Sequence, residues 1–154
     1  MADPKYLSVD DFKAEAPESR LAELSQDTPN SYTVDDTIIK KALLWAEGIF
    51  ESKIASRSDY VIKKTEVIEG SKDEATIKEF IYDCAMWKLF KRREFIPDAI
   101  QLAFDTQMTW ISDVVSRKAD LPIFDSTTGE QIDTQSHQPV IEKDATNEFD
   151  DWSY

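Results

Sequence analysis

The chain has 154 residues, of which 31 are acidic and 18 basic, so its formal net charge is −13. This length suits one domain with a sizeable core, and the charge argues against binding nucleic acid through bulk electrostatics. No apolar stretch approaches the roughly 18 residues that cross a membrane, and the N-terminus lacks a signal-peptide pattern. We therefore expect a soluble protein made in the cytoplasm. Its single cysteine, Cys84, is expected to be a buried, reduced thiol.

Two short helices are predicted first. The first is predicted in "VDDFKAEA", which follows Ser8, because Ser8 and Asp11, three residues apart, have the spacing of a helix cap. Pro17 then opens a second helix in "PESRLAELSQ", because proline is favoured at the first helical position.

A long helix is predicted in "TVDDTIIKKALLWAEGIFESKIASR", where Thr33 and Asp36 have the spacing of a capping box. Its apolar residues recur with a helical period: Ile39, Leu43, Ala46, Phe50 and Ile54. The following stretch, "DYVIKKTEVIEGS", has neither helical period nor clean alternation. A short hairpin near residues 60–69 and an extended loop both remain open there.

The next long helix, "SKDEATIKEFIYDCAMWKLFKRR", has Ser71 three residues before Glu74, again the spacing of a cap. Its apolar residues cover so much of the circumference that we expect the central helix of a bundle: Ile77, Phe80, Ile81, Cys84, Ala85, Leu89 and Phe90.

A third long helix is predicted to begin at Pro97, with Asp98 favoured by the helix dipole. Its apolar stripe comprises Ile100, Ala103, Phe104, Met108, Ile111, Val114 and Val115. Trp45, Trp87 and Trp110 place one large ring on each long helix, and we expect them to pack together in the core. The fold class predicted is all-α, a small helical bundle of three long and two short helices.

An acidic C-terminal stretch follows the helices: residues 119–154 carry a net charge of −8, against +1 for residues 38–118. Such composition does not bury enough apolar surface to fold alone. We therefore divide the chain into a helical domain, 1–122, and an extended acidic arm, 123–154. Isolated apolar residues of the arm are candidate interface anchors: Phe124, Val140, Ile141, Phe149, Trp152 and Tyr154. A disordered, solubilising tail is the alternative.

Residues with catalytic chemistry are sparse. Glycine occurs only three times, which argues against a phosphate-binding loop. The single histidine, His137, lies in the acidic arm, away from Cys84, so a Cys–His nucleophile or a zinc site lacks parts. We expect no enzymatic activity, no cofactor and no metal.

The most apolar helix ends in a basic cluster of Lys88, Lys91, Arg92 and Arg93. Cations at this place are favoured by the negative end of the helix dipole, by about 0.3–1 kcal/mol each. Contact with an acidic surface of a neighbouring subunit, or with DNA phosphate, would also explain the cluster. The sequence leaves these three interpretations open.

The order of the helices and the residues at their ends resemble a known family. The stretches that carry the resemblance are "YLSVDDFKAEAP", "LAEL", "ALLWAEGIFESKIASR", "DCAMWKLFKRR" and "DAIQLAFDTQMTWISDVVSRKADLP". Over about residues 5–122 the chain looks like the head–tail connector (adaptor, or head completion) proteins of tailed bacteriophages and Mu-like prophages.

The resemblance implies a structural protein of the virion. Such proteins form a homo-oligomeric ring at the head–tail junction, expected to be a dodecamer that follows the twelve-fold portal. The ring binds the portal protein and offers a platform to the next neck or tail protein, and it meets DNA only as the passing genome. The resemblance also implies that Lys88, Lys91, Arg92 and Arg93 face the portal or a neighbouring subunit. The acidic arm could contact a sibling subunit, the portal or a tail component.

A second function class fits the charge alone. A small acidic regulatory protein that masks the nucleic-acid site of a partner would also be strongly negative. It would be a monomer or dimer whose acidic residues form one contiguous face and whose binding collapses with salt.

Overall fold

The computed structural model describes residues 1–28, 32–57, 60–61, 72–119 and 124–125, and within them the fold is all-α as predicted, apart from two very short strands. The helices are α1 (Val9–Glu15), α2 (Glu18–Ser25), α3 (Asp36–Ala55), α4 (Lys72–Arg92) and α5 (Asp98–Val115). None of these helices is long and apolar enough to cross a membrane.

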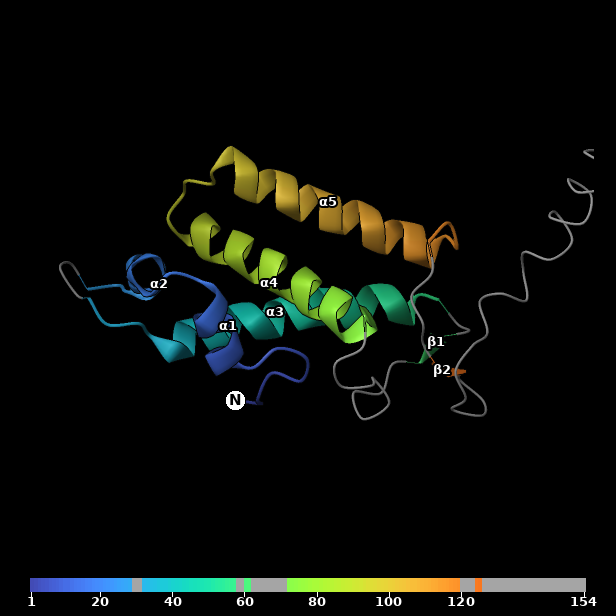
Figure 1. The fold of residues 1–154 in the computed structure, drawn as a ribbon, viewed down its shortest axis with the longest axis horizontal. Helices are drawn as coiled ribbons and strands as arrows, with labels where there is room; N and C mark the ends of the chain where they lie inside the picture. Colours follow the sequence, from blue (N-terminus) through green and yellow to red (C-terminus); the bar gives the residue numbers. More distant parts are fainter. Residues whose placement is uncertain (29–31, 58–59, 62–71, 120–123, 126–154) are drawn as a thin grey trace, which may run out of the picture.

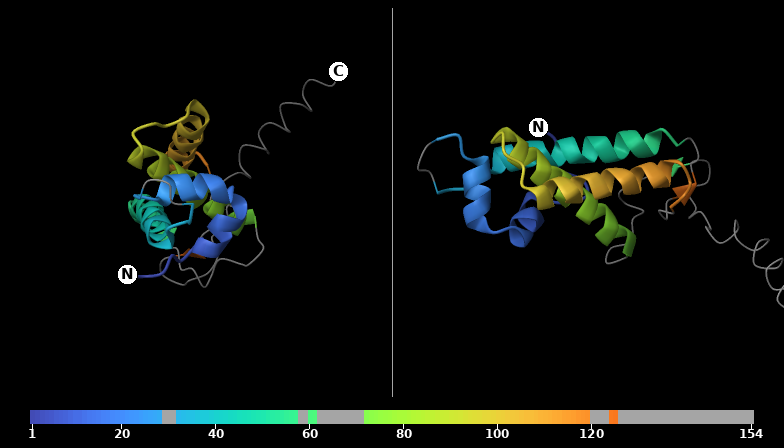
Figure 2. Two further views of the ribbon diagram at one scale, coloured as in Figure 1. Left: turned by 90° about the vertical axis from the view of Figure 1, so that its left-hand side faces the viewer. Right: turned by 90° about the horizontal axis from the view of Figure 1, so that it is seen from above.

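Helix α4 is the central element. It contacts α3, α5 and α2, and it crosses obliquely between α3 and α5 when the molecule is seen from above (Figure 2). The short helices α1 and α2 pack beside this three-helix body, near the start of α3 (Figure 1). The prediction that this helix is central is confirmed.

The core confirms most of the predicted apolar faces. Every residue named for the faces of α3 and α4 is buried. Phe50 on α3 contacts the Phe80 ring on α4, with 5.5 Å between centroids. Cys84 is buried, and burial raises the pKa of its thiol to about 12.

The stripe of α5 is less completely covered than predicted. Ile111 and Val114 are buried, whereas Ile100, Phe104 and Met108 are only half-buried. The reason is that α5 is an edge helix, which packs on α4 and α3 (Figure 2).

Helix starts agree with the predicted caps in one case and differ in others. Ser8 Oγ accepts from the Asp11 amide at 3.1 Å, as predicted. The capping box at Thr33 is wrong, because Asp35 is the N-cap of α3 and its Oδ1 accepts from the Thr37 amide at 2.9 Å. The buried Ser25 hydroxyl accepts from the Asp35 amide at 2.9 Å, a tertiary contact that holds Asp35 in place.

Both prolines precede their helices by one residue. Pro17 is the N-cap of α2 and Pro97 that of α5, each with extended ψ, so the prediction that α5 begins at Pro97 is early by one position. Ser71, the predicted cap of α4, lies outside the described residues.

Of the stretch 60–69, in which a hairpin is possible, the structure describes residues 60–61. They form a two-residue strand that pairs with a stretch distant in the sequence. β1 (Tyr60–Val61) pairs antiparallel with β2 (Phe124–Asp125), the stretch that follows α5 in the chain. Residues 62–69, on which the rest of the predicted hairpin falls, lie outside the description.

Candidate functional site

The four basic residues at the end of α4 divide into two pairs that face different parts of the molecule. Arg92 and Arg93 reach helix α2, whereas Lys88 and Lys91 lie over the rings of two tryptophans.

The arginine pair binds the C-terminal end of α2. Arg92 Nη1 donates to the Leu24 carbonyl at 2.9 Å, and its Nη2 contacts Asp27 at 2.5 Å. Arg93 donates from Nη2 and Nε to the Glu23 carbonyl, at 2.8 and 3.2 Å. The last carbonyls of a helix lack intrahelical donors. The two guanidinium groups of α4 provide hydrogen-bond donors for those of α2.

The lysine pair covers an aromatic stack formed by Trp45 of α3, Trp87 of α4 and Phe104 of α5. The ring centroids of Trp87 and Phe104 are 4.3 Å apart, and those of Trp45 and Trp87 are 5.8 Å apart. Lys88 Nζ lies 4.7 Å from the Trp45 ring and Lys91 Nζ lies 4.8 Å from the Trp87 ring. These are cation–π distances.

The three tryptophans were expected to pack together, and the structure brings only two of them into mutual contact. Trp45 and Trp87 stack, while Trp110 packs on Phe80 with 5.9 Å between centroids. All three are half-buried, since they lie at the boundary of the core rather than within it.

Hydrogen bonds hold the Trp87 ring in place. Its Nε1 donates to Gln101 Oε1 at 2.9 Å, and Gln101 Nε2 donates to Asp105 at 2.9 Å. The hydrogen bond to Gln101 on α5 therefore fixes the orientation of the half-buried Trp87 indole within the stack.

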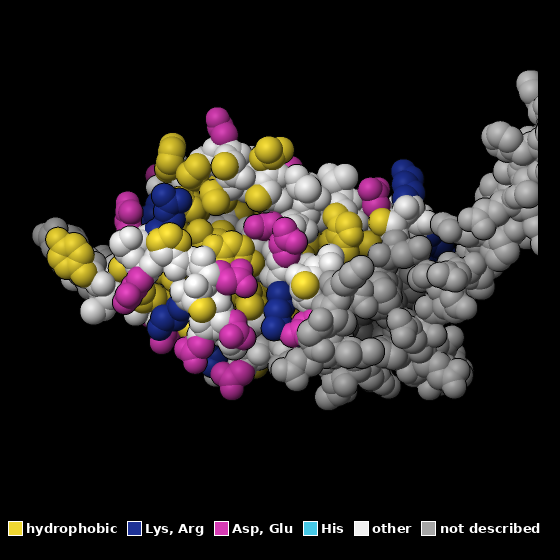
Figure 3. All heavy atoms as spheres, in the orientation of Figure 1, with side chains coloured by type: hydrophobic (Ala, Val, Ile, Leu, Met, Phe, Trp, Pro, Cys, Tyr) yellow, Lys and Arg dark blue, Asp and Glu magenta, His cyan; other side chains and the backbone are white. Residues whose placement is uncertain are grey.

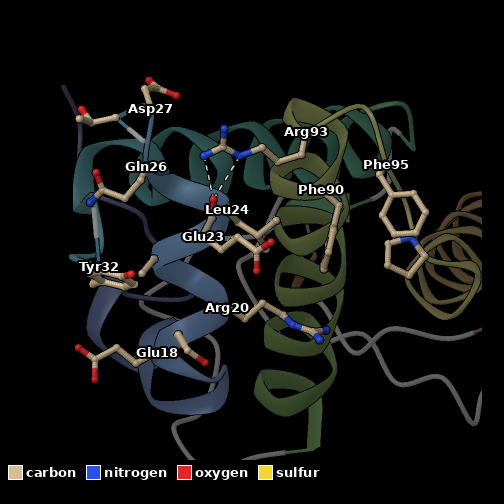
Figure 4. A pocket seen from close by; sticks show the side chains of 14 residues that line it. Glu18, Arg20, Glu23, Leu24, Gln26, Asp27, Tyr32, Phe90, Arg93 and Phe95 are labelled. Atoms are coloured by element: carbon tan, nitrogen blue, oxygen red, sulfur yellow. Dashed lines mark hydrogen bonds between the residues drawn. The ribbon is translucent and has the colours of Figure 1, made fainter. Parts of the chain in front are cut away.

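A groove of about 1110 Å³ lies between α2 and the end of α4, beside Arg93 (Figure 4). Its apolar lining includes Leu24 and Phe90, both buried, and its rim includes Tyr32 and Phe95, which are 87% and 68% exposed. The guanidinium carbon (Cζ) of Arg20 lies 5.8 Å from the centre of the Phe90 ring, within cation–π range.

The groove is electrically mixed. Glu18, Glu23 and Asp27 line it together with Arg20 and Arg93, and Asp27 is paired with Arg92. Hydrophobic side chains are visible on the surface over the end of the molecule where α2, α4 and α5 meet (Figure 3). Exposed aromatic side chains around a groove are typical of a surface that contacts another protein.

The buried carboxylate of Glu47 is a feature that the predictions missed. Its Oε1 accepts from the backbone amides of Lys5 and Tyr6, at 2.6 and 2.8 Å, and so fastens the N-terminal segment to α3. Burial raises the pKa of Glu47, although both hydrogen bonds act in the opposite direction. The signal was present: Glu47 follows Leu43 by four residues and precedes Phe50 by three, which places it on the apolar face.

Other predicted site residues have no described side chains. Phe124 lies in β2, where only the backbone is described. The remaining anchors fall in 126–154, outside the description: Val140, Ile141, Phe149, Trp152 and Tyr154. Among the residues that are described, no group of three or more His, Cys, Asp or Glu could hold a metal ion.

Comparison with known proteins gives one family. The model of the family described as Bacteriophage Mu, Gp36 matches residues 6–140, which is most of the chain. A search of the curated proteins finds no match.

Proposed function

The chain belongs to the bacteriophage Mu Gp36 family, and from that membership we propose that this phage protein is a structural component of the virion. It forms a ring at the head–tail junction, binds the portal and carries the next neck or tail protein while the genome passes through. It is made in the host cytoplasm and then incorporated at the junction.

The observation that supports an assembly role is the apolar surface at one end of the bundle. Tyr32 and Phe95 are large, exposed and adjacent to an open groove, and the aromatic stack is only half-covered. A small chain that presents two such surfaces is suited to contact more than one neighbour. A ring protein between a portal and a tail has that requirement.

The basic end of α4 is expected to contribute to assembly through its lysines. Arg92 and Arg93 already donate to α2. Lys88 and Lys91 make no ion pair with a described residue, so their charges are available to an acidic surface. Either the portal or a neighbouring copy supplies that surface.

The test is co-sedimentation of the full chain with portal rings from the same genome. We expect stoichiometric binding, and weaker binding by a chain cut after Pro122. Absence of binding by the full chain, at both low and physiological salt, would contradict the proposal.

A matched pair of variants examines the groove in the same assay. Phe95→Ser removes an exposed ring from the groove rim, and Leu102→Ser removes an equally exposed side chain (67% against 68%) on α5 that does not line the groove. We expect only Phe95→Ser to weaken the loading of the ring.

A further inference from the structure

We infer that the aromatic stack and its lysines form a docking site for residues 148–154, "EFDDWSY", of a neighbouring copy of this chain. The inference rests on the proposed ring and specifies which surfaces its subunits use.

The first support is a group of lysines that have no carboxylate partner among the described residues. Lys88 and Lys91 lie over the stack, and Lys41, which is exposed, lies one turn before Trp45 on α3. Within the described part of the chain none of the three pairs with a carboxylate. Asp105, which Gln101 links to the Trp87 indole, accepts a hydrogen bond from Gln101 Nε2.

Such lysines are unusual in a chain with 31 acidic and 18 basic residues. Most ion pairs of the described residues use lysines elsewhere: Lys5 with Glu51, Lys13 with Asp36, Lys40 with Asp3. The surface thus combines lysines that have no ion pair among the described residues with half-buried aromatic rings. A segment that carries both carboxylates and aromatic rings would complement it.

The second support is the composition of residues 148–154. The segment alternates acidic and aromatic side chains: Glu148, Phe149, Asp150, Asp151, Trp152 and Tyr154. Carboxylates placed beside Lys41, Lys88 and Lys91 would be neutralised, and rings placed against Trp45, Trp87 and Phe104 would bury apolar surface. Aromatic anchors of this kind carry most of the binding energy of protein interfaces.

The third support is geometry. Trp45 and Phe104 lie in the first halves of α3 and α5, whereas β1 and β2 lie at the other end of the body, where those helices finish (Figure 1). The arm thus begins at the end of the body where α3 and α5 finish, whereas the aromatic stack lies nearer the middle of α3. A contact between two different surfaces of identical chains is heterologous, and its repetition gives a ring when the rotation between subunits closes; the twelve-fold portal would impose that rotation.

Residue Gly48 permits a direct test. It is exposed on α3, three residues after Trp45, and a Cβ added there meets no atom within 4 Å. Full-length Gly48→Cys therefore offers a thiol beside the stack, and full-length Ser153→Cys offers one beside Trp152. Cys84 is buried and the pKa of its thiol is raised, so it does not compete in disulfide exchange.

The two proteins, each with one cysteine added to the native Cys84, are mixed on portal rings and oxidised. We expect a covalent dimer, and with both substitutions in one chain a ladder of dimers, trimers and larger species. Ala14→Cys, at an exposed position of α1, replaces Gly48→Cys as the matched control and is expected to give no dimer. In a Lys41→Gln, Lys88→Gln, Lys91→Gln background the dimer yield should fall roughly tenfold.

The outcomes separate this inference from the proposed function. Rings that load on the portal but show no Gly48→Cys crosslink, or a crosslink only within one chain, overturn the inference and leave the ring standing. Wild-type chain that does not load on the portal contradicts the ring itself. If Gly48→Cys impairs loading, Ser52→Cys, exposed one turn later on α3, takes its place.

Discussion

Arginines and lysines at the end of α4 lie within two turns of one helix, yet they contact different parts of the molecule. Arg92 and Arg93 donate to the carbonyls that end α2, and so hold one part of the chain to another. Lys88 and Lys91 lie on tryptophan rings with no carboxylate partner among the described residues. A run of like charges can thus contain one pair bonded to another helix and a second pair without a carboxylate partner among the described residues.

The chemistry of the side chains explains the division. A guanidinium has a planar set of donors that can bind backbone carbonyls in a fixed geometry, whereas an ammonium is a compact, well-hydrated charge. The pair that ends the helix therefore fastens α2, while the lysines keep their charge near solvent.

The largest effect is expected from removing the arginine pair. Arg92→Ala with Arg93→Ala should lower the free energy of unfolding by about 2 kcal/mol, because carbonyls at the end of α2 lose charged donors. The Arg92–Asp27 pair adds little, since Asp27 is 70% exposed. Urea denaturation measures the loss. Lys53→Ala with Lys118→Ala, two exposed basic residues, is the control, and an equal loss there would contradict the account.

A smaller effect on stability is expected at the lysine pair. Lys88→Gln with Lys91→Gln removes two cation–π contacts and should lower the free energy of unfolding by about 1 kcal/mol or less. The same urea titration decides the comparison. If this variant lost as much as the arginine variant, the lysines would also be structural and the division would be wrong.

A gain is expected just after the cluster. Glu94 has φ 58°, in the left-handed region that favours glycine, and its acidic side chain lies beyond the negative end of α4. Glu94→Gly should therefore raise the free energy of unfolding by about 0.5 kcal/mol. Arg117, with φ 65° after α5, is the matched position. Arg117→Gly should gain less, because it also removes a favourable cation and its contacts.

A pH dependence is expected from Glu47, which contrasts with the exposed charges of α4. The pKa of this carboxyl is raised in the folded state, above its ordinary 4.5. Its contribution to stability is therefore fully present below pH 4.5 and is lost as the pH rises through the folded pKa. Glu47→Gln keeps an acceptor for the amides of Lys5 and Tyr6 but does not titrate. The unfolding free energy of the wild type minus that of Glu47→Gln should rise as the pH falls towards 4.5.

The opposite trend would show that the ionised carboxylate is the preferred form at the N-terminal segment. Chemical denaturation of both proteins at matched pH values distinguishes the two cases, because all other titrating groups cancel in the difference.

The sequence predicted the helices and their buried faces well, because the apolar period of α3 and α4 is strong and local. It failed at the start of α3, where the buried hydroxyl of Ser25, ten residues earlier, holds Asp35. That contact depends on how α2 packs, which no local pattern records.

The candidate site was predicted only in part. The basic cluster was found, and so was its position at a helix end, but its division was not. Which of Lys88, Lys91, Arg92 and Arg93 faces α2 depends on the rotation of α4 within the bundle. The groove rim was not predicted, because Tyr32 and Phe95 lie in the connections between helices, which have no apolar periodicity.

The most direct measurement of the central claim is the mass of portal rings loaded with full-length variants, determined by mass photometry. We predict that Lys88→Gln with Lys91→Gln, folded like the wild type by circular dichroism, loads several-fold less protein on each ring. Lys53→Ala with Lys118→Ala, two exposed basic residues that line neither the groove nor the aromatic stack, should load like the wild type. Full loading by the lysine variant would contradict the claim that this pair is kept for assembly.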